Sequence, residues 1–569
     1  MSSNTSPEFD AIVVGSGISG GWAAKELTER GLKVLLVERG PHITHREDYS
    51  GEDKAPWEMP FAGRIPEEEA NRDYFVQKDC YALEGATKKF FVNDRTHQYI
   101  HPKEKPFSWI RGYQLGGRSQ LWARQTYRWS DIDFRANKTD DHGVDWPIRY
   151  KDIAPWYDHV EKFAGISGSL EGLDQLPDGK FLPPMEMNCV EVEAKQKIEK
   201  AFPTRKMIIG RCANLTEPTK EHLELGRGRC QYRNECEKGC SFGASFSSLS
   251  ATLPAAQRTK NLTTVTDAIV DSVIYDNVTK RATGVKIIDA NTKEYRQYFG
   301  RTIFLCASTL GSTQIMLNSI SESFPNGIAN SSGTLGHYLM DHIFMSGAIG
   351  EHPGFQKNYY SGRRPNGIYI PRYRNVTEKD DRFLRGYGFQ GGASRPNWRR
   401  GSNMQGIGLE LKEKLREPGS WQFHLGGFGE MLPDKRNRVL LDKNKQDQWG
   451  IPLLNIECEL HDNEFKMLDA MSDDAAAMLS AAGIINIQKY NEAAPPGLAI
   501  HEMGTARMGH NPSSSVLNKF NQTHDVSNLF VTDGSAMTSS ACQNPSLTYM
   551  ALTARASAYA VQLLKEGTI

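Results

Sequence analysis

FDAIVVGSGISG, residues 9–20, joins a short apolar run to a turn that contains three glycines. The apolar run has the composition of a buried strand, and apolar residues recur at helical spacing after the turn until Gly31, which is a typical helix stop. A second apolar run, residues 33–38, follows and ends at Glu38. Strand, glycine turn, helix and strand in this order predict the first βαβ unit of a doubly wound, mostly parallel sheet.

The three glycines of this turn have separate physical tasks. Gly15 permits the tight turn, Gly17 lets the backbone approach a pyrophosphate, and Gly20 lets the helix pack closely on the strand. The amides at the helix start then face phosphate oxygens, and Glu38 stands where a carboxylate accepts the hydroxyls of a ribose. Glycine-rich turns are common, so the prediction of a dinucleotide site depends on this strand, helix and acid together. The turn alone does not distinguish NAD from FAD.

The bulk composition argues against two broad classes of protein. The 569 residues contain 68 basic and 68 acidic side chains, so no overall field favours nucleic acid or an anionic membrane. No apolar run approaches the roughly 20 residues that span a bilayer. The start of the chain is polar and lacks the apolar core of a signal peptide. We therefore expect either a cytoplasmic protein or one exported as the folded passenger of a partner that carries the signal.

The rest of the chain divides into segments of different character. Residues 41–108 are irregular and rich in aromatics, as expected for an excursion that covers a cofactor. Strand patterns return in residues 262–306. Residues 345–460 alternate apolar and polar in many short runs, which predicts an antiparallel sheet in a second lobe. A strand and turn at residues 528–534 precede a terminal helix that starts at residue 545.

Five motifs occur in a fixed order along the chain. They are the first βαβ unit, LGGRS at residues 115–119, LGHYLMDH at 335–342, HEMGT at 501–505, and residues 528–545. In this order they resemble the glucose–methanol–choline (GMC) oxidoreductase family over essentially the full length. The resemblance implies FAD and the α/β GMC fold, in which a Rossmann-type FAD-binding domain is joined to a second, antiparallel-sheet substrate-binding domain.

On this basis we expect the FAD-binding domain to be assembled from three stretches of chain. Residues 1–165 form its first part with the excursion, residues 256–344 its second part, and residues 496–569 its C-terminal part with the catalytic residues. Residues 166–255 carry a cysteine loop as an insertion. Residues 345–495 form the substrate-binding domain.

The resemblance also assigns contacts to the cofactor. It implies Gly116, Gly117 and Ser119 along the flavin, Asp533 and Gly534 near its pyrophosphate or ribityl chain, and Val265 or Ala268 beside the adenine. In pyranose oxidases, a histidine of the second glycine segment bonds covalently to the flavin. This sequence has Leu121 at that place. Leucine cannot form the bond, so we predict that FAD binds non-covalently.

His501 is the predicted catalytic base. Oxidation of an alcohol requires a base for the hydroxyl proton while a hydride leaves the carbon, and imidazole titrates near neutral pH. In the family the histidine of H-x-x-G-T has this role, and the asparagine of a later Asn-Pro pair assists it. Here these residues are His501 and Asn544. We expect Asn544 to donate to the developing alkoxide and to hold the alcohol in line.

Residues that bind the substrate are harder to predict. Gln422, His424 and Glu430 lie in the predicted second sheet and could line the face that looks at the flavin. They could equally be ordinary sheet residues, which we slightly favour. Aromatic side chains are plentiful, but they fit a packed core as well as a sugar-binding surface.

Cys230, Cys236 and Cys240 form the tight group among nine cysteines, in a loop rich in glycine and arginine. Without a secretory context, an odd number of cysteines does not predict a disulfide framework. The spacing resembles the 3Fe–4S loop of bacterial sugar dehydrogenases of the GMC family, which predicts such a cluster with these three ligands. Zinc, with Cys212 or His222 as a further ligand, and free thiols are the alternatives.

These features together predict an FAD-dependent sugar dehydrogenase. The iron–sulfur loop resembles that of glucoside 3-dehydrogenase flavoprotein subunits, which oxidise the C3 hydroxyl of glucose and glucosides to 3-keto sugars. The resemblance implies electron transfer through the cluster to a cytochrome-type acceptor, and a small subunit that carries an export signal. Gluconate, fructose and other sugar dehydrogenases or a pyranose oxidase are the nearest alternatives. A flavin-dependent lyase, or a scaffold that binds FAD without turnover, is less favoured.

Overall fold

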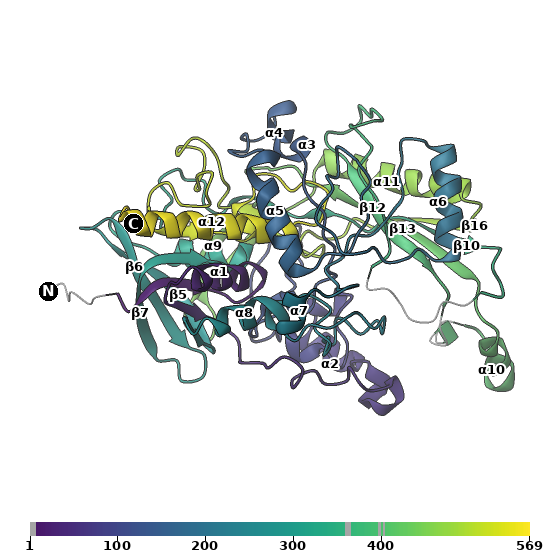
Figure 1. Cartoon of the computed structure of the whole chain (residues 1–569), viewed down its shortest axis with the longest axis horizontal. Helices are drawn as coiled ribbons and strands as arrows, with labels where there is room; N and C mark the ends of the chain where they lie inside the picture. Colours follow the sequence, from purple (N-terminus) through teal and green to yellow (C-terminus); the bar gives the residue numbers. More distant parts are fainter. Residues whose placement is uncertain (1–6, 359–365, 397–399, 402–403) are drawn as a thin grey trace.

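The computed structural model describes residues 7–358, 366–396, 400–401 and 404–569, which form two lobes side by side along the longest axis (Figure 1). One lobe contains the first glycine turn and the C-terminal helix, and the other contains a second sheet with two covering helices. Residues 1–6, part of the polar start on which the expectation about export depends, lie outside the described residues.

The first lobe is built on a seven-stranded sheet of order β4-β2-β1-β7-β6-β5, with β18 also paired to β7. Its strands are β1 (Phe9–Val14), β2 (Val34–Val37), β4 (Leu262–Val265), β5 (Ala268–Asp276), β6 (Arg281–Asp289), β7 (Tyr295–Leu305) and β18 (Leu529–Val531). β4, β2, β1, β7 and β18 run parallel, whereas β5 and β6 form an antiparallel extension. The apolar runs of β1 and β2 are buried because helices cover both faces of a parallel sheet. The predicted doubly wound unit is confirmed.

The helices packed on this sheet or on one another are α1 (Ile18–Glu29), α5 (Tyr150–Ala164), α8 (Leu253–Arg258), α9 (Thr309–Asn318) and α12 (Ser546–Glu566). The connecting segments contain α2 (Glu67–Asp73), α3 (Asp131–Phe134), α4 (Ala136–Thr139) and α7 (Lys220–Glu224). α12 packs against both α1 and α5, as Figure 1 shows, and is buried on several sides. Its small and apolar residues allow this close approach, so the terminal helix predicted from residue 545 is confirmed.

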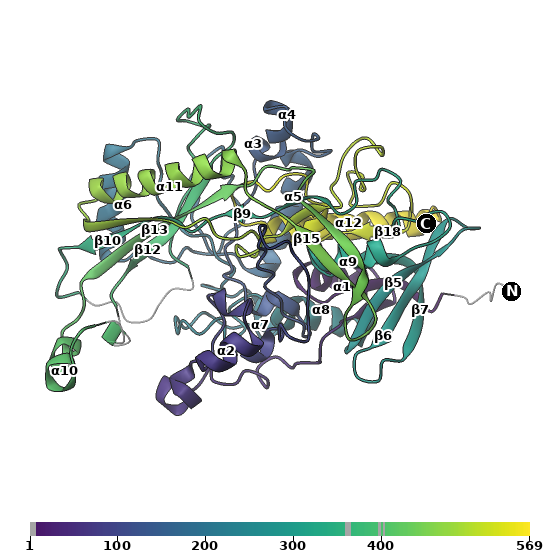
Figure 2. The same ribbon diagram turned by 180° about the vertical axis from the view of Figure 1, so that it is seen from behind.

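The second lobe is an antiparallel sheet of order β16-β10-β13-β12-β11-β3, with β9 paired to β13. Its strands are β3 (Ile208–Ile209), β9 (His342–Ile343), β10 (Ser346–His352), β11 (Ile368–Ile370), β12 (Tyr387–Ser394), β13 (Trp421–Glu430) and β16 (Ile485–Asn491). Helices α6 (Cys189–Ala201) and α11 (Asp462–Ala481) bury one face of it, as Figures 1 and 2 show, while α10 (Gly408–Arg416) projects away. The predicted antiparallel sheet is confirmed.

A third sheet of four strands was not predicted. Its order is β15-β14-β8-β17, made of β8 (His337–Met340), β14 (Arg438–Gln446), β15 (Pro452–Glu457) and β17 (Met503–Thr505). The hairpin β14–β15 had been expected in the second sheet, but it pairs with β8 instead. Because β8 also pairs with β17, the LGHYLMDH and HEMGT motifs are brought side by side.

The excursion between β2 and the second glycine segment contains only α2 and short 3-10 turns (Pro56–Glu58, Pro60–Gly63, Gln77–Asp79 and Lys88–Phe90), as its irregular sequence predicted. The end of the excursion returns to its start, where the Leu115 amide donates to the Pro41 carbonyl at 3.0 Å. Over the described parts of the chain, no helix has both the length and the apolar character required to cross a membrane.

Candidate active site

An elongated cavity runs from the first glycine turn to the second sheet. Ten of the predicted site residues line it: Gly15, Gly17, Glu38, Gly117, Ser119, Ala268, Asp533, Gly534, His501 and Asn544. Gly20, Gly116 and Val265 do not line it. Val265 lies at the end of β4, where its carbonyl accepts the Glu38 amide at 2.8 Å, so of the two adenine candidates Ala268 is the one on the cavity wall.

The first glycine turn leaves space and unpaired donors at the start of α1. A Cβ atom added to Gly17 would have no described protein atom within 4 Å, whereas one added to Gly20 would lie 1.8 Å from the Gly15 carbonyl oxygen. α1 begins without a side-chain cap, and Gly17, Ile18 and Ser19 at its start line the cavity. Among the described residues, the buried Ser19 hydroxyl also has no hydrogen-bond partner. These features fit a pyrophosphate at this end of the cavity.

Glu38 is tied to the turn that it follows. Its carboxylate accepts hydrogen bonds from the Ser16 amide at 3.0 Å, the Ser16 hydroxyl at 2.5 Å and the Gly40 amide at 3.0 Å. Burial raises the pKa of Glu38. The Ser16 hydroxyl also accepts the Gly116 amide at 2.8 Å. Glu38 therefore helps to hold the two glycine segments together, and a carboxylate has further lone pairs for a ribose.

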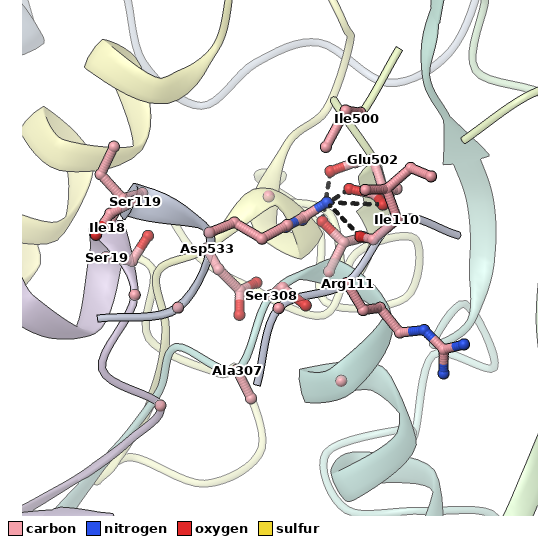
Figure 3. A pocket seen from close by; sticks show the side chains of 18 of the residues that line it. Ile18, Ser19, Ile110, Arg111, Ser119, Ala307, Ser308, Ile500, Glu502 and Asp533 are labelled. Atoms are coloured by element: carbon pink, nitrogen blue, oxygen red, sulfur yellow. Dashed lines mark hydrogen bonds and ion pairs between the residues drawn. The ribbon is translucent and has the colours of Figure 1, made fainter. Parts of the chain in front are cut away.

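The middle of the cavity lies between these segments and the C-terminal turn (Figure 3). Figure 3 shows Ser19 and Ser119 on one side, Glu502 and Ile110 on the other, and Asp533 between them. Asp533 accepts the Ser535 amide at 3.0 Å and thereby caps the 3-10 turn Gly534–Ala536.

Arg118 and Glu502 form a two-point ion pair beside the cavity. The Arg118 guanidinium donates to the two Glu502 carboxylate oxygens at 3.1 and 2.9 Å and to the Ile110 carbonyl at 3.1 Å. Glu502 is buried and Arg118 is about a quarter exposed, at 26%. The pair links the second glycine segment to the segment that carries His501, so it fixes one end of the cavity relative to the other.

His501 lies between a second histidine and Asn544. Its Nδ1 is 2.9 Å from the Nδ1 of His342, whose Nε2 lies 3.2 Å from the Ser540 carbonyl oxygen. The amide of Asn544 donates to Nε2 of His501 at 3.3 Å. The side chain of Gln390 on β12 donates to Oδ1 of Asn544 at 2.7 Å and so orients that amide. The predicted pair His501 and Asn544 is thus in contact at the cavity wall.

Asp341 holds the backbone around His501 in place. Its carboxylate accepts the amides of Gly497 at 2.7 Å, Ala499 at 3.2 Å and His501 at 3.0 Å. Burial, with a smaller effect of the nearby Glu502 charge, raises the pKa of Asp341 to about 7. Ile500 within this segment has a positive φ of 63°. Three bonds to one carboxylate secure this bend.

Both histidines of the site are neutral at ordinary pH. Burial lowers the pKa of His342 to about 4. Burial, together with the nearby His342 and the Arg118 guanidinium, lowers the pKa of His501 well below its ordinary value. A neutral imidazole has one unprotonated nitrogen and can therefore accept a proton.

An aromatic wall covers the catalytic end of the cavity. Phe344 and Phe428 stack with ring centroids 5.6 Å apart, and Phe428 lies 6.3 Å from the His501 ring. The three substrate candidates do not line the cavity. His424 bonds the Tyr490 hydroxyl at 2.7 Å, Gln422 is exposed, and the buried Glu430 carboxylate forms an ion pair with Arg385. Instead, Phe428 from the same strand β13 and Gln390 from the neighbouring β12 line the cavity.

The predicted 3Fe–4S site is not supported. Within the described residues, no three His, Cys, Asp or Glu side chains are placed to hold a metal ion. Cys230 packs in an apolar cluster, and burial raises the pKa of Cys230 and raises that of Cys236 to about 12. Cys240 is half-buried and unbonded to another cysteine.

The alternative of a zinc site is not supported, because its two proposed further ligands have other hydrogen-bond partners. The Cys212 thiol is buried and donates to Asn214 Oδ1 at 3.2 Å. The ring Nδ1 of His222 accepts the Thr219 amide at 3.1 Å in the cap of α7, and its Nε2 lies 3.1 Å from the Lys162 and Phe163 carbonyls. Among the described residues, neither side chain belongs to a group of three ligands placed to hold a metal ion. The structure therefore favours free thiols.

Several residues of the site were not predicted. Asp341 and His342 lie in the LGHYLMDH motif, Arg118 in LGGRS and Glu502 in HEMGT. The motifs therefore marked these positions but did not indicate what each side chain does. Gln390 and the two phenylalanines carry no local signal at all.

Comparison with known proteins places the chain among flavin-dependent oxidoreductases. Two family models, both described as GMC oxidoreductase, match residues 9–344 and 433–553. The chain is 28% identical to 2-methyl-1,2-propanediol dehydrogenase of Mycolicibacterium austroafricanum, over 97% of this chain and 95% of that protein. It is 25% identical to the fructose dehydrogenase large subunit of Gluconobacter japonicus, over 99% and 100%.

A solved structure shares the fold. Formate oxidase of Aspergillus oryzae RIB40, in a variant made to study FAD modification, superposes with a TM-score of 0.62 over 100% of both chains at 13% identity.

Proposed function

The chain belongs to the GMC oxidoreductase family, an FAD-using family acting on CH–OH groups, and we propose that it is a dehydrogenase of polyhydroxylated substrates. The C3 hydroxyl of glucose or a glucoside is the specific site of oxidation that we propose. The observation that carries the proposal is the His501–Asn544 pair on the wall of the same cavity as the first glycine turn.

The residues of the cavity fit FAD. The open space at Gly17, the unpaired Ser19 hydroxyl and the uncapped start of α1 would hold the pyrophosphate, with Glu38 at the ribose. Leu121 lines the cavity and cannot bond to a flavin, which supports non-covalent binding. When bound, FAD supplies an acceptor for the hydride that leaves the substrate carbon.

The chain's own part in the reaction is proton transfer and orientation. His501 takes the hydroxyl proton of the substrate on Nε2 as the C–H bond gives up its hydride, so the alcohol becomes a carbonyl. The amide of Asn544, already directed at this nitrogen, donates to the substrate oxygen while negative charge develops on it. Gln390 holds that amide, and Phe344 and Phe428 limit water at the reacting end.

The substrate class is inferred from two sides. Propane-1,2-diols and fructose both contain adjacent oxygen-bearing carbons, as does the C3 region of glucose. In this chain, Gln125 and Gln390 line the catalytic end; their amides already bond Asn366, Tyr127 and Asn544, but each NH2 group has a second N–H for a neighbouring hydroxyl. A second hydroxyl held there would fix which carbon faces His501.

We further propose an electron acceptor other than oxygen. Both curated relatives described above are named dehydrogenases, and one is named a large subunit, which supports a small partner subunit and a cytochrome-type acceptor for this chain. Export with such a partner is part of the same proposal. No electron transfer through the cysteine loop is included. An assay of iron and acid-labile sulfide in the purified protein tests whether the cysteine loop holds a cluster. Stoichiometric iron would show that it does.

Anaerobic addition of sugars, glucosides and vicinal diols to the FAD-loaded protein tests the function. At least one polyol is expected to bleach the flavin absorbance, and NMR of the product is expected to locate a new carbonyl, at C3 for a glucoside. Product formation without bleaching would instead indicate a lyase. Bleaching by no compound of the panel would contradict the proposal.

The pH dependence of flavin reduction is a separate prediction. Since burial and the neighbouring His342 and Arg118 lower the pKa of His501, the base stays unprotonated below the ordinary imidazole pKa near 6.5. The acid limb of kcat/KM is therefore expected clearly below pH 6.5, measured by stopped flow from pH 5 to 9 at constant ionic strength. An acid limb centred at or above pH 6.5 would contradict the low pKa of His501.

A further inference from the structure

His342 lies behind His501 as seen from the cavity, and its ring nitrogens have well-defined partners. Its Nε2 is 3.2 Å from the carbonyl oxygen of Ser540. A carbonyl oxygen can only accept a hydrogen bond, so this nitrogen must carry the proton. Ser540 is itself fixed to the end of β13, since its hydroxyl accepts the Met431 amide at 3.1 Å and donates to the Met431 carbonyl at 3.0 Å.

The proton on Nε2 determines the rest of the chain of bonds. Because burial keeps His342 neutral, its Nδ1 has no proton and can only accept. The Nδ1 of His501, 2.9 Å away, must therefore be the donor. A neutral His501 with a protonated Nδ1 has its lone pair on Nε2, the nitrogen that faces Asn544.

The opposite end of the network requires the same arrangement. Gln390 donates to Oδ1 of Asn544, so the Asn544 nitrogen points at His501 and needs an acceptor there. The other tautomer of His501 would set a lone pair against the lone pair of His342 and an N–H against the amide of Asn544. The Ser540 carbonyl and the Gln390 amide thus independently select one tautomer.

We propose that His342 is a positioning residue that holds His501 in the tautomer whose unprotonated Nε2 faces the substrate. This inference rests on the proposed function, because it assigns His501 as the base. His342 does not line the cavity and touches no substrate. After proton transfer, the His501 imidazolium still donates from Nδ1 to His342. The acquired proton leaves on the cavity side, because passing the Nδ1 proton on would move the positive charge to the buried His342, whose pKa burial lowers to about 4.

Two substitutions at His342 and one control test the inference. His342→Leu replaces the imidazole by an apolar side chain and removes the acceptor, so His501 is no longer held in the productive tautomer or orientation. We expect flavin reduction by substrate to slow by about 10²-fold or more, with the dissociation constant of the substrate nearly unchanged. His342→Asn places an amide oxygen near the former Nδ1, and is expected to retain activity within about 10-fold.

His337→Leu is the matched control. His337 lies on β8, five residues earlier, where its Nδ1 is 3.0 Å from the Lys435 carbonyl and away from the cavity. The His337→Leu variant is expected to reduce flavin at the parental rate. If His342→Leu reduces flavin at the parental rate, the inference is overturned. It is also overturned if His342→Leu and His342→Asn both retain flavin and lose the same fraction of the flavin-reduction rate.

A readout independent of turnover separates this inference from the proposed function. NMR of protein labelled with ¹⁵N-histidine, with His501 assigned by its loss in His501→Ala, reports which ring nitrogen carries the proton. We expect Nδ1–H in the parent and in His342→Asn, and a mixture in His342→Leu. Nε2–H on His501 in the parent would overturn the inference even if no variant folds. If none of the polyols reduces the flavin of the parent protein, only the proposed function fails.

Discussion

Replacement of His501 by alanine is expected to slow the reduction of flavin by substrate about 10²- to 10⁴-fold, the range for removal of a general base. The imidazole stands at the cavity wall with a lone pair directed at Asn544, and burial lowers its pKa so that it is unprotonated near neutral pH. The measurement is anaerobic stopped flow with a polyol that bleaches the parent protein.

The variant should keep its flavin, because the contacts assigned to the pyrophosphate lie at the other end of the cavity. His510→Ala, an exposed histidine nine residues along the chain, is the control and should match the parent. A His501→Ala protein that retains flavin and reduces it at the parental rate would support a scaffold or a different base.

Gly17→Ala is expected to weaken FAD binding by about 10- to 100-fold without unfolding the protein. A Cβ at this position meets no described protein atom within 4 Å, so the apoprotein tolerates the methyl group. The same methyl group would occupy the space assigned to the pyrophosphate, and overpacking of such a contact costs about 1–3 kcal/mol. Titration of apoprotein with FAD, followed by flavin fluorescence, measures the affinity, and thermal unfolding of the apoprotein measures its stability.

Gly20→Ala distinguishes two possible causes of weaker FAD binding, a blocked pyrophosphate site and a destabilised apoprotein. Its Cβ would lie 1.8 Å from the Gly15 carbonyl oxygen, so the strand and helix must move apart even without FAD. We expect a lower unfolding temperature of the apoprotein for Gly20→Ala and an unchanged one for Gly17→Ala. Gly228→Ala, whose Cβ would make an ordinary 3.5 Å contact away from the cavity, is the control. Parental FAD affinity in Gly17→Ala would contradict the assigned pyrophosphate site.

Much of the fold could be predicted because the relevant signals are local. The apolar runs of β1 and β2 and the glycine stop after α1 lie within 30 residues of each other. The alternation in β12 and β13 likewise predicted an antiparallel sheet. Alternation does not identify the partner of a strand, however. The hairpin β14–β15 therefore could not be assigned to β8, which lies about 100 residues earlier in the chain.

In the site too, residues within motifs could be predicted, whereas their partners from distant parts of the chain could not. The motif context indicated His501 and Asn544, and the structure brings them into contact. The partners that orient them, His342 and Gln390, are more than 150 residues away in the sequence, at separations of 159 and 154. Such pairs depend on the third sheet and on the contact between lobes, which no local pattern contains.

The cysteine loop shows that spacing alone does not establish a metal site. Three cysteines within eleven residues suggested a cluster, but spacing does not fix the direction of side chains. Cys230 faces an apolar cluster with Leu215 and Ala244, and the Cys236 thiol lies 3.9 Å from the Asn214 amide.

A crystal structure of the FAD-loaded protein tests the central claim most directly. The expected result is a flavin ring at the catalytic end of the cavity, with its hydride-accepting edge turned toward Nε2 of His501 and the amide of Asn544. A ring bound elsewhere, or one whose reactive edge faces away from His501, would contradict the assignment of His501 as the base.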